Sequence, residues 1–167
     1  IKSFIARPNF VSYLTSMNSE RQTPENVSFD VMDGEKWKDP QWTKFRAESK
    51  MNMLVQLNMD WFQPYTYSPY SVCCVYLCIL SLHRSVRYKR ENVILLTLLP
   101  PTLKSKTQET VKTTQINEML LPATMQLLAL WTDGMRLTYM VGELAVHAVC
   151  RVALFLISCD MPATRTL

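Results

Sequence analysis

Four apolar runs along the chain have the length and composition of β-strands. They cover residues 51–63, 70–80, 92–99 and 146–159, and they are rich in β-branched, aromatic and other apolar side chains. The run at 92–99 is apolar at successive positions, which predicts a central strand that is covered on both faces. A shorter apolar stretch, 135–141, predicts one more strand.

Helical periodicity is clearest between residues 115 and 131. Apolar side chains recur there at helical spacing: Leu120, Leu121, Leu127, Leu128 and Trp131. Pro122 lies inside this stretch, and because proline has no backbone donor it either kinks the helix or marks its start. Asp133-Gly134 is a turn signal that ends the helix.

The first 50 residues are more polar, and their periodicity is weak. They predict an N-terminal arm of mixed or irregular structure (1–50), which precedes a main domain over residues 51–167. Within the arm we expect a short helix near 9–17, followed by an extended stretch that turns at Asp33-Gly34. Trp37 and Trp42 are expected to anchor the arm on the main domain.

The order of these elements is strand, strand, strand, helix, strand. Three sequential strands with short connections predict an antiparallel meander, and the helix then returns a strand parallel to the first. The sequence therefore predicts an α/β fold with one mixed sheet. This strand order is that of the ribonuclease-H-like fold.

Composition narrows the function classes. The 167 residues are 48% hydrophobic and 19% charged, which is typical of a globular domain, and the net charge of +4 permits a nucleic-acid partner without requiring one. Three glycines cannot build a glycine-rich phosphate loop, which excludes P-loop and Rossmann sites. The five cysteines lie in apolar runs without a C-x-x-C pair, so we expect free thiols in a reducing compartment.

No apolar run reaches the roughly 18 residues that a membrane-spanning helix needs. The run at 72–80 is too short, and the run at 144–157 is interrupted by His147 and Arg151. We therefore expect no membrane partner, and a small membrane-associated protein is the weakest alternative.

Two of the predicted strands end in an aspartate. Asp60 lies near the end of the first run, directly after residues 54–59, and precedes Pro64, whereas Asp160 directly follows the last run and precedes Pro162. If these strands are parallel neighbours, the two carboxylates meet at one sheet edge, where they suit a hard divalent cation such as Mg²⁺. A single aspartate of this kind is more often a turn former, and two such strands together leave the two interpretations about even.

A basic segment connects the second and third predicted strands. It contains Arg84, Arg87, Lys89 and Arg90, which either contact phosphates or form a solvated turn. Three tyrosines after the first strand, Tyr65, Tyr67 and Tyr70, could stack on unpaired bases, although packing is the favoured interpretation.

Several segments together resemble one protein family. The chain is similar to CACTA-type (En/Spm-like) DDE transposases, especially their fungal version. The similar segments, in order, are 33–38, 57–65, 68–72, 84–94, 128–131 and 159–165. The blocks that contain Asp60 and Asp160 are specific when they occur together with the Arg90-Glu91-Asn92-Val93-Ile94 block between them.

The resemblance implies DNA strand cleavage and transfer that depends on Mg²⁺ (or Mn²⁺), held by acidic residues. Asp60 is then the first catalytic acid and Asp160 the second, and both are metal ligands. Arg84, Arg87, Lys89 and Arg90 are expected to contact DNA. The implied partner is DNA, namely transposon ends, the implied compartment is the nucleus, and oligomerisation is possible.

The third acid of the family, a glutamate, lies well beyond the second aspartate. No acid follows Asp160 in the printed sequence. The resemblance therefore covers the N-terminal half of a catalytic domain, a ribonuclease-H-like core truncated at its C-terminus. We expect weak metal binding and no transposition by this chain alone. The alternative is a non-catalytic, transposon-derived DNA-binding or interaction protein.

Overall fold

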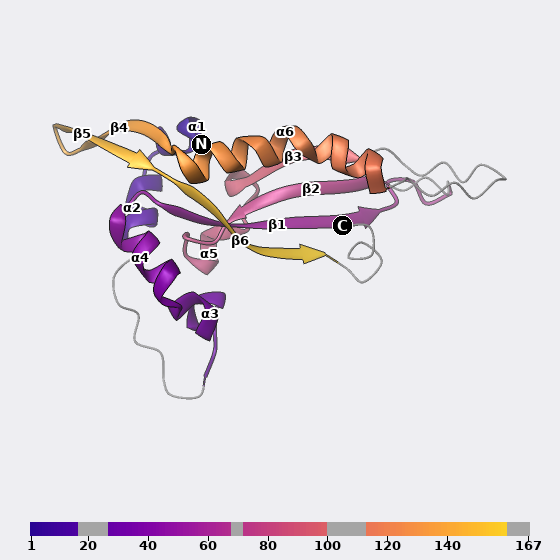
Figure 1. Ribbon diagram of the computed structural model, residues 1–167, viewed down its shortest axis with the longest axis horizontal. Coiled ribbons are helices and arrows are strands. Elements are labelled where there is room, and N and C mark those ends of the chain that lie inside the picture. Colours follow the sequence, from indigo (N-terminus) through magenta and orange to yellow (C-terminus); the bar gives the residue numbers. More distant parts are fainter. Residues whose placement is uncertain (17–26, 68–71, 100–112, 160–167) are drawn as a thin grey trace.

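A four-stranded sheet forms the centre of the protein (Figure 1). The computed structural model describes residues 1–16, 27–67, 72–99 and 113–159. The strands of this sheet are β1 (Met53–Phe62), β2 (Val72–Ile79), β3 (Val93–Leu99) and β6 (Val152–Cys159). They lie in the order β3-β2-β1-β6. The prediction that strand 92–99 is central and covered on both faces is wrong, because β3 is at the edge of this sheet and Leu95 and Leu98 on one of its faces are exposed.

The directions of these strands agree with the predicted mixed sheet. β1 and β2 are antiparallel, as are β2 and β3, whereas β6 returns parallel to β1. The parallel pair runs from Met53 opposite Val152 to Met59 opposite Cys159, with one irregularity after Val55. The prediction of an α/β fold with a mixed sheet is confirmed.

The prediction of one long strand over 146–159 is wrong. β4 (Met135–Val141) and β5 (Leu144–Cys150) form a separate two-stranded hairpin, and the chain leaves it at Arg151 to enter β6. The backbone N–H of Arg151 donates to Asn52 Oδ1 at 2.9 Å, and the Arg151 carbonyl accepts from Met53 N at 2.9 Å. These bonds attach Arg151 to the start of β1, so the apolar run bends there. The short strand predicted at 135–141 is confirmed.

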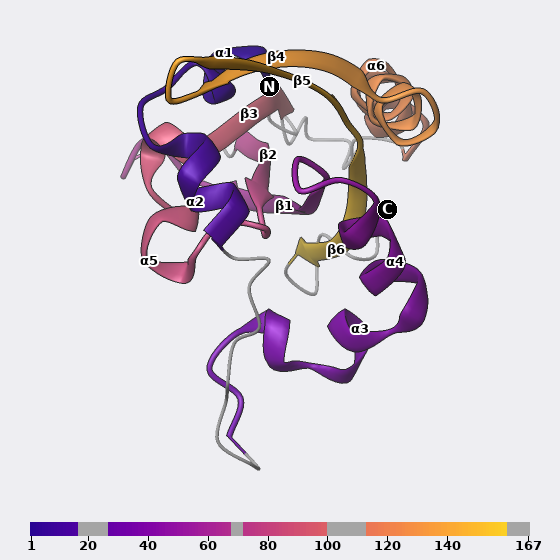
Figure 2. The same cartoon turned by 90° about the vertical axis from the view of Figure 1, so that its left-hand side faces the viewer.

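Helix α6 (Thr113–Thr132) runs along one face of the sheet (Figures 1 and 2). Ile116 is fully buried, and Leu120 and Leu127 pack with Leu57 and Leu96 of the sheet. The packing of Ile116, Leu120 and Leu127 on the sheet offsets the backbone hydrogen bond that the helix loses at Pro122, which lies inside it. The helix predicted at 115–131 is confirmed.

The N-terminal region is more helical than its weak periodicity indicated. It contains α1 (Lys2–Ile5), α2 (Phe10–Ser16), α3 (Glu35–Lys38) and α4 (Pro40–Glu48), with a 3₁₀ turn at Val31–Asp33. Asp39 begins α4 by accepting a hydrogen bond from Gln41 N at 3.1 Å, and Pro40 occupies the first helical position. The helix near 9–17 is confirmed over the residues that the structure describes. The extended stretch predicted after it is wrong where α3 and α4 form, and α1 was not predicted.

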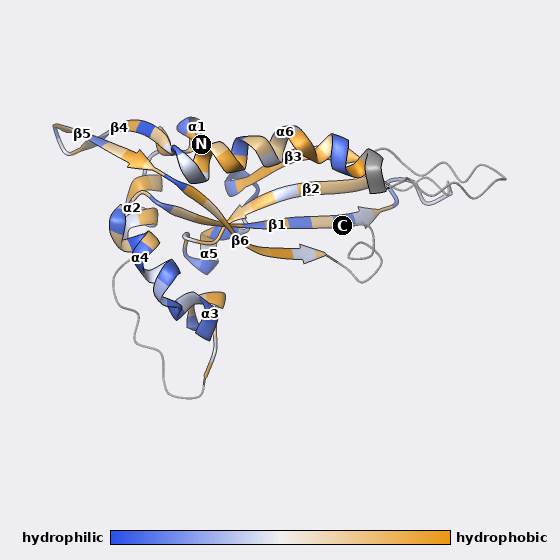
Figure 3. Ribbon diagram, in the orientation of Figure 1, coloured by the Kyte–Doolittle hydropathy of each residue, from blue (hydrophilic) through white to orange (hydrophobic). Residues whose placement is uncertain are grey.

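Aromatic side chains hold this region on the main domain, as predicted. The ring centroid of Phe155 on β6 lies 5.3 Å from that of Trp37 and 5.4 Å from that of Trp42. Trp42 also lies 6.2 Å from Trp131 of α6. Figure 3 shows the polar and apolar residues of α3 and α4 beside the more apolar sheet. The arm therefore covers part of the sheet on the side of β6.

Candidate functional site

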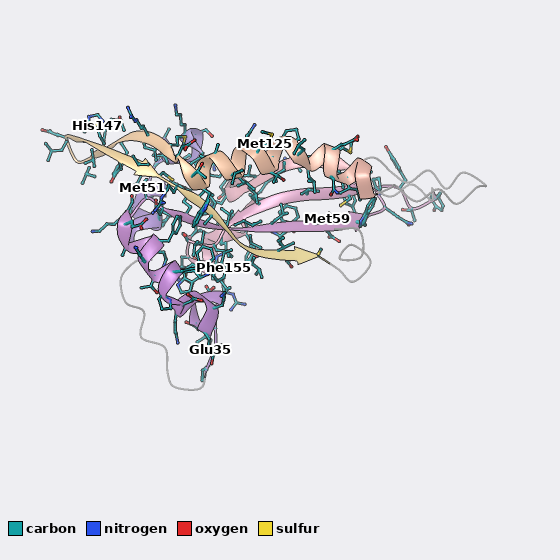
Figure 4. All side chains as sticks on the ribbon, viewed as in Figure 1. Glu35, Met51, Met59, Met125, His147 and Phe155 are labelled. Carbon is teal, nitrogen blue, oxygen red and sulfur yellow. The ribbon has the colours of Figure 1, made fainter. Side chains whose placement is uncertain are left out.

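The residue pairing of β1 and β2 places polar side chains on the face of the sheet opposite α6. Asn58 lies opposite Tyr76, and Asp60 lies opposite Cys74. Side chains alternate between faces along a strand, so Asn58 and Asp60 share one face, whereas Met59 between them packs in the core beneath α6. Met59 is labelled on β1 in Figure 4.

Asp60 is exposed near the carboxyl end of β1. Asp160 lies outside the described residues, so the predicted meeting of the two carboxylates is not tested. The strands that lead to them are described as far as Met59 and Cys159, which are partners in the parallel pair. The prediction that these strands are adjacent and parallel is confirmed.

Two buried amide side chains, Gln56 and Asn58, precede Asp60 on the same face of β1. Gln56 Nε2 donates to Asn58 Oδ1 at 2.7 Å, and Asn58 Nδ2 lies 3.5 Å from Cys78 Sγ. Both amide residues are 8% exposed. Because buried amides are costly to leave unpaired, these bonds fix the orientation of Asn58, two residues before the carboxylate.

The charge of Asp60 affects its neighbours across the strand pair. Burial raises the pKa of the Cys74 thiol, and the Asp60 carboxylate raises it further. Burial also raises the pKa of Tyr76, with smaller contributions from Cys78, Asp60, Cys74 and Tyr88. Burial is the main cause of both shifts, and the smaller contribution of Asp60 is consistent with its carboxylate lying near Cys74 and Tyr76.

The basic segment is helical rather than a simple turn. It forms α5 (Arg84–Arg87), followed by a 3₁₀ turn at Arg90–Asn92. Arg84, Lys89 and Arg90 are exposed. Arg84 Nη1 donates to the Phe29 carbonyl at 2.6 Å.

Arg87 is not the surface residue that the sequence predicted. It is 2% exposed, and its guanidinium donates to Asp30 Oδ1 at 2.8 Å and Oδ2 at 3.2 Å. It also donates to the carbonyls of Leu80 and Leu82. These bonds occupy the guanidinium in the interior, so the assignment of Arg87 to DNA contact is corrected to a structural role.

The predicted stacking tyrosines are only partly described. Tyr65 is 63% exposed and Tyr67 is 100% exposed, whereas Tyr70 lies outside the described residues. Two other aromatic residues escaped the sequence analysis: Phe62 at the end of β1 and Tyr88 after α5. Phe62 could have been found from the alternation along β1, which puts it on the face of Asp60.

The histidines serve local structure. His83 caps α5 by accepting a hydrogen bond from Ser85 N at 3.2 Å. His147, labelled on the β4–β5 hairpin in Figure 4, is hydrogen bonded to the Thr138 hydroxyl at 2.9 Å. All five cysteines are free thiols. Across the described parts of the chain, no three histidine, cysteine, aspartate or glutamate side chains form a group that could hold a metal ion.

An apolar cleft of about 340 Å³ lies between α6 and the sheet. Its lining includes Trp42, Leu57, Leu127, Trp131 and Leu154, and no titratable side chain. This cleft offers no group for acid, base or metal chemistry, so the candidate site remains the opposite face around Asp60.

No helix within the described ranges is both long and apolar enough to span a bilayer.

No protein-family model, curated protein or solved structure matches this chain.

Proposed function

We propose that this chain is part of a DDE-type, Mg²⁺-dependent enzyme of DNA strand cleavage and transfer, built on a ribonuclease-H-like core. Asp60 and Asp160 share one divalent cation, Mg²⁺ or Mn²⁺. The partner is DNA and the compartment is the nucleus. The proposal rests on the resemblance of the two aspartate blocks to CACTA-type transposases and on the arrangement of the strands that carry them.

One observation carries the proposal. Met59 and Cys159 are partners in the parallel pair of β1 and β6, and the next residue of the sequence after each is an aspartate. Parallel strands present their carboxyl ends at the same edge of a sheet. A turn-former interpretation explains each aspartate separately, but it does not explain why both follow partnered residues.

Asp60 suits the ion that the family uses. Its carboxylate is exposed, it supplies the hard oxygen ligand that Mg²⁺ prefers, and it lies beside the fixed amide of Asn58. When bound, such ions activate the attacking oxygen and stabilise the leaving oxygen in phosphodiester chemistry. The protein itself supplies the negative charge of Asp60 and the hydrogen-bonded amides of Gln56 and Asn58 beside it.

In this proposal, exposed basic side chains attract the phosphates of the DNA backbone. Arg84, Lys89 and Arg90 lie together in the segment between β2 and β3, and their charge lowers the cost of bringing phosphates to the sheet. The same feature favours the second candidate, a non-catalytic DNA-binding or interaction protein. The two candidates differ in whether the carboxylates bind metal.

Manganese titration separates them. We expect the wild-type chain to bind Mn²⁺ weakly at one site, and Asp60→Asn and Asp160→Asn each to weaken that binding by about tenfold or more, a loss of about 1.4 kcal/mol. Asp133→Asn is the matched control, because Asp133 is an exposed aspartate at the end of α6. Equal affinity in the wild-type and Asp60→Asn chains would reject the metal site and leave the second candidate.

A further inference from the structure

A second cleft, of about 870 Å³, lies between the N-terminal helices and the β4–β5 hairpin. One wall is formed by α1, α2 and the residues that connect them, and the other wall is formed by β4. Figures 1 and 2 both show α1 beside β4. The lining includes six consecutive residues of β4, 136–141, and none of the β5 residues, which the structure describes in full. The cleft therefore runs along the edge of β4 that faces away from β5.

The backbone of β4 presents hydrogen-bonding groups on this edge. Val141 and Leu144 are partners on either side of a two-residue loop, and residues that flank such a loop exchange backbone hydrogen bonds. Bonded and non-bonded pairs alternate along an antiparallel ladder, so the backbone groups of Arg136, Thr138 and Met140 point away from β5. Among the described strands, β4 pairs with β5 alone. These N–H and C=O groups are therefore available to an additional strand.

The cleft is also basic. Its lining contains the cations Lys2, Arg7 and Arg136, and no acidic side chain among the residues that the structure describes. The guanidinium of Arg7 is held in place, because it donates to the Glu91 carbonyl and its central carbon lies 4.1 Å from the centroid of the Phe4 ring. Lys2 and Arg136 are exposed, and neither forms an ion pair within the described ranges. Uncompensated positive charge beside an open strand edge complements an acidic segment.

We propose that this cleft binds an extended acidic segment of a partner protein, which adds to β4 as a third strand of the hairpin sheet. The main chain of the segment bonds the open edge of β4, and its carboxylates lie near Lys2, Arg7 and Arg136. At about 3.3 Å per residue, residues 136–141 pair with a segment of roughly six residues. The inference goes beyond the proposed function and does not rest on it, because the cleft contains none of the residues around Asp60.

Two other occupants fit this cleft less well. A second copy of the chain that paired through the same edge of β4 would bring two basic clefts together, with no acid in the described lining of either to offset the repulsion. A nucleic acid would satisfy the cations, but it cannot continue the ladder of N–H and C=O groups along the strand. An acidic peptide strand satisfies both features.

Fluorescence anisotropy with a labelled peptide of about eight residues, alternating glutamate and valine, tests the cleft, since such a peptide spans the edge of β4. We expect the full chain to bind this peptide. The matching peptide of alternating lysine and valine should bind about tenfold more weakly or worse, because like charges across an interface repel. Unlabelled oligothymidylate of equal charge should not displace the acidic peptide.

Methylation of backbone amides in the peptide tests the ladder without altering the protein. Alternate residues of an extended chain direct their backbone groups to opposite edges, so only one alternating set of amides faces β4. Methylating that set should abolish binding. Methylating the other set should leave binding close to that of the parent peptide.

Charge variants test the basic residues. Arg136→Glu should weaken binding of the acidic peptide about tenfold or more, because it places a like charge at the edge, whereas Arg136→Lys should retain most of the affinity. Lys44→Glu is the matched control, since Lys44 is an exposed cation on α4 outside the cleft. Asp60→Asn should bind the peptide as the wild type does, so failure of the metal site and failure of this cleft are distinguishable.

The inference is rejected if the basic peptide binds as tightly as the acidic one, if both methylated peptides bind like the parent, or if Arg136→Glu binds no more weakly than Lys44→Glu. Displacement by oligothymidylate at equal charge would assign the cleft to a nucleic acid instead. A chain that self-associates without peptide, and that separates when the peptide is added, would assign the edge of β4 to a second copy.

Discussion

The buried pair of Asp30 and Arg87 is expected to be a main determinant of stability. The side chains of Arg87 and Asp30 are 2% and 1% exposed, and they make two parallel hydrogen bonds. Asp30→Asn keeps the shape of the side chain but leaves the guanidinium without its counter-charge. Arg87→Met leaves a buried carboxylate and removes the donors to the carbonyls of Leu80 and Leu82.

The expected cost is large compared with the stability of a domain. Removing one partner of a buried ion pair costs about 3–5 kcal/mol, because the remaining charge has neither its partner nor water. Domains of this kind have about 5–15 kcal/mol of stability in total, so either variant should lose roughly a fifth or more. Arg87→Met should cost more than Asp30→Asn, since it also leaves two backbone carbonyls with fewer donors.

Urea unfolding followed by tryptophan fluorescence measures this cost, since the chain contains four tryptophans and Trp37 is 8% exposed. The double variant should lose less than the sum of the single variants, because it leaves no unpaired charge. Asp39→Asn is the matched control. It disrupts the exposed pair with Lys36 while keeping a side chain that can cap α4, so little change is expected. A cost below about 1 kcal/mol for both buried variants would refute the reasoning.

Three further outcomes are expected. Gly134→Ala should lower the unfolding temperature more than Gly142→Ala does. Both glycines have positive φ (70° and 61°), but only at Gly134 would an added Cβ lie 2.7 Å from a side-chain carbon, so equal losses would contradict the prediction. Asp60→Asn should speed alkylation of Cys74 at mildly alkaline pH, because removing the carboxylate charge lowers the raised pKa of this thiol and increases its thiolate fraction. Cys150, whose pKa burial raises to about 12, should still react slowly, and an unchanged rate at Cys74 would show that the Asp60 charge does not affect this thiol. The chain alone should not cleave or join DNA strands in Mg²⁺ or Mn²⁺, since two aspartates leave one of two ions short of ligands, and a cleavage product lost in Asp60→Asn would overturn this expectation.

The central sheet could be predicted because its information is local. Each strand is an apolar run bounded by proline, glycine or polar residues, and the crossover helix has clear periodicity. The parallel placement of the last strand then follows from chain order. Asp60 could be singled out on the same grounds, because it follows an apolar run directly.

The rest depended on contacts between distant residues or on signals that were overlooked. The bend at Arg151 comes from bonds to Asn52 and Met53, and no glycine or proline marks it in the sequence. The turn before it was readable, since Gly142 with positive φ is a typical first residue of a two-residue hairpin loop. Asp39-Pro40 likewise signals the start of α4. The burial of Arg87 was not readable, because its partner Asp30 precedes it by 57 positions.

The parallel pairing of β1 and β6 has a consequence for how the chain is made. Asn52 and Arg151, which bond at the start of this pair, are 99 positions apart in sequence. At a synthesis rate of about 5–20 residues per second, β1 waits roughly 5–20 s on the ribosome before its neighbour exists. The meander of β1, β2 and β3 can form in that interval, whereas the side of β1 that receives β6 stays unpaired. During translation this side of β1 is the place where a nascent chain is most open to chaperones or to a second nascent chain.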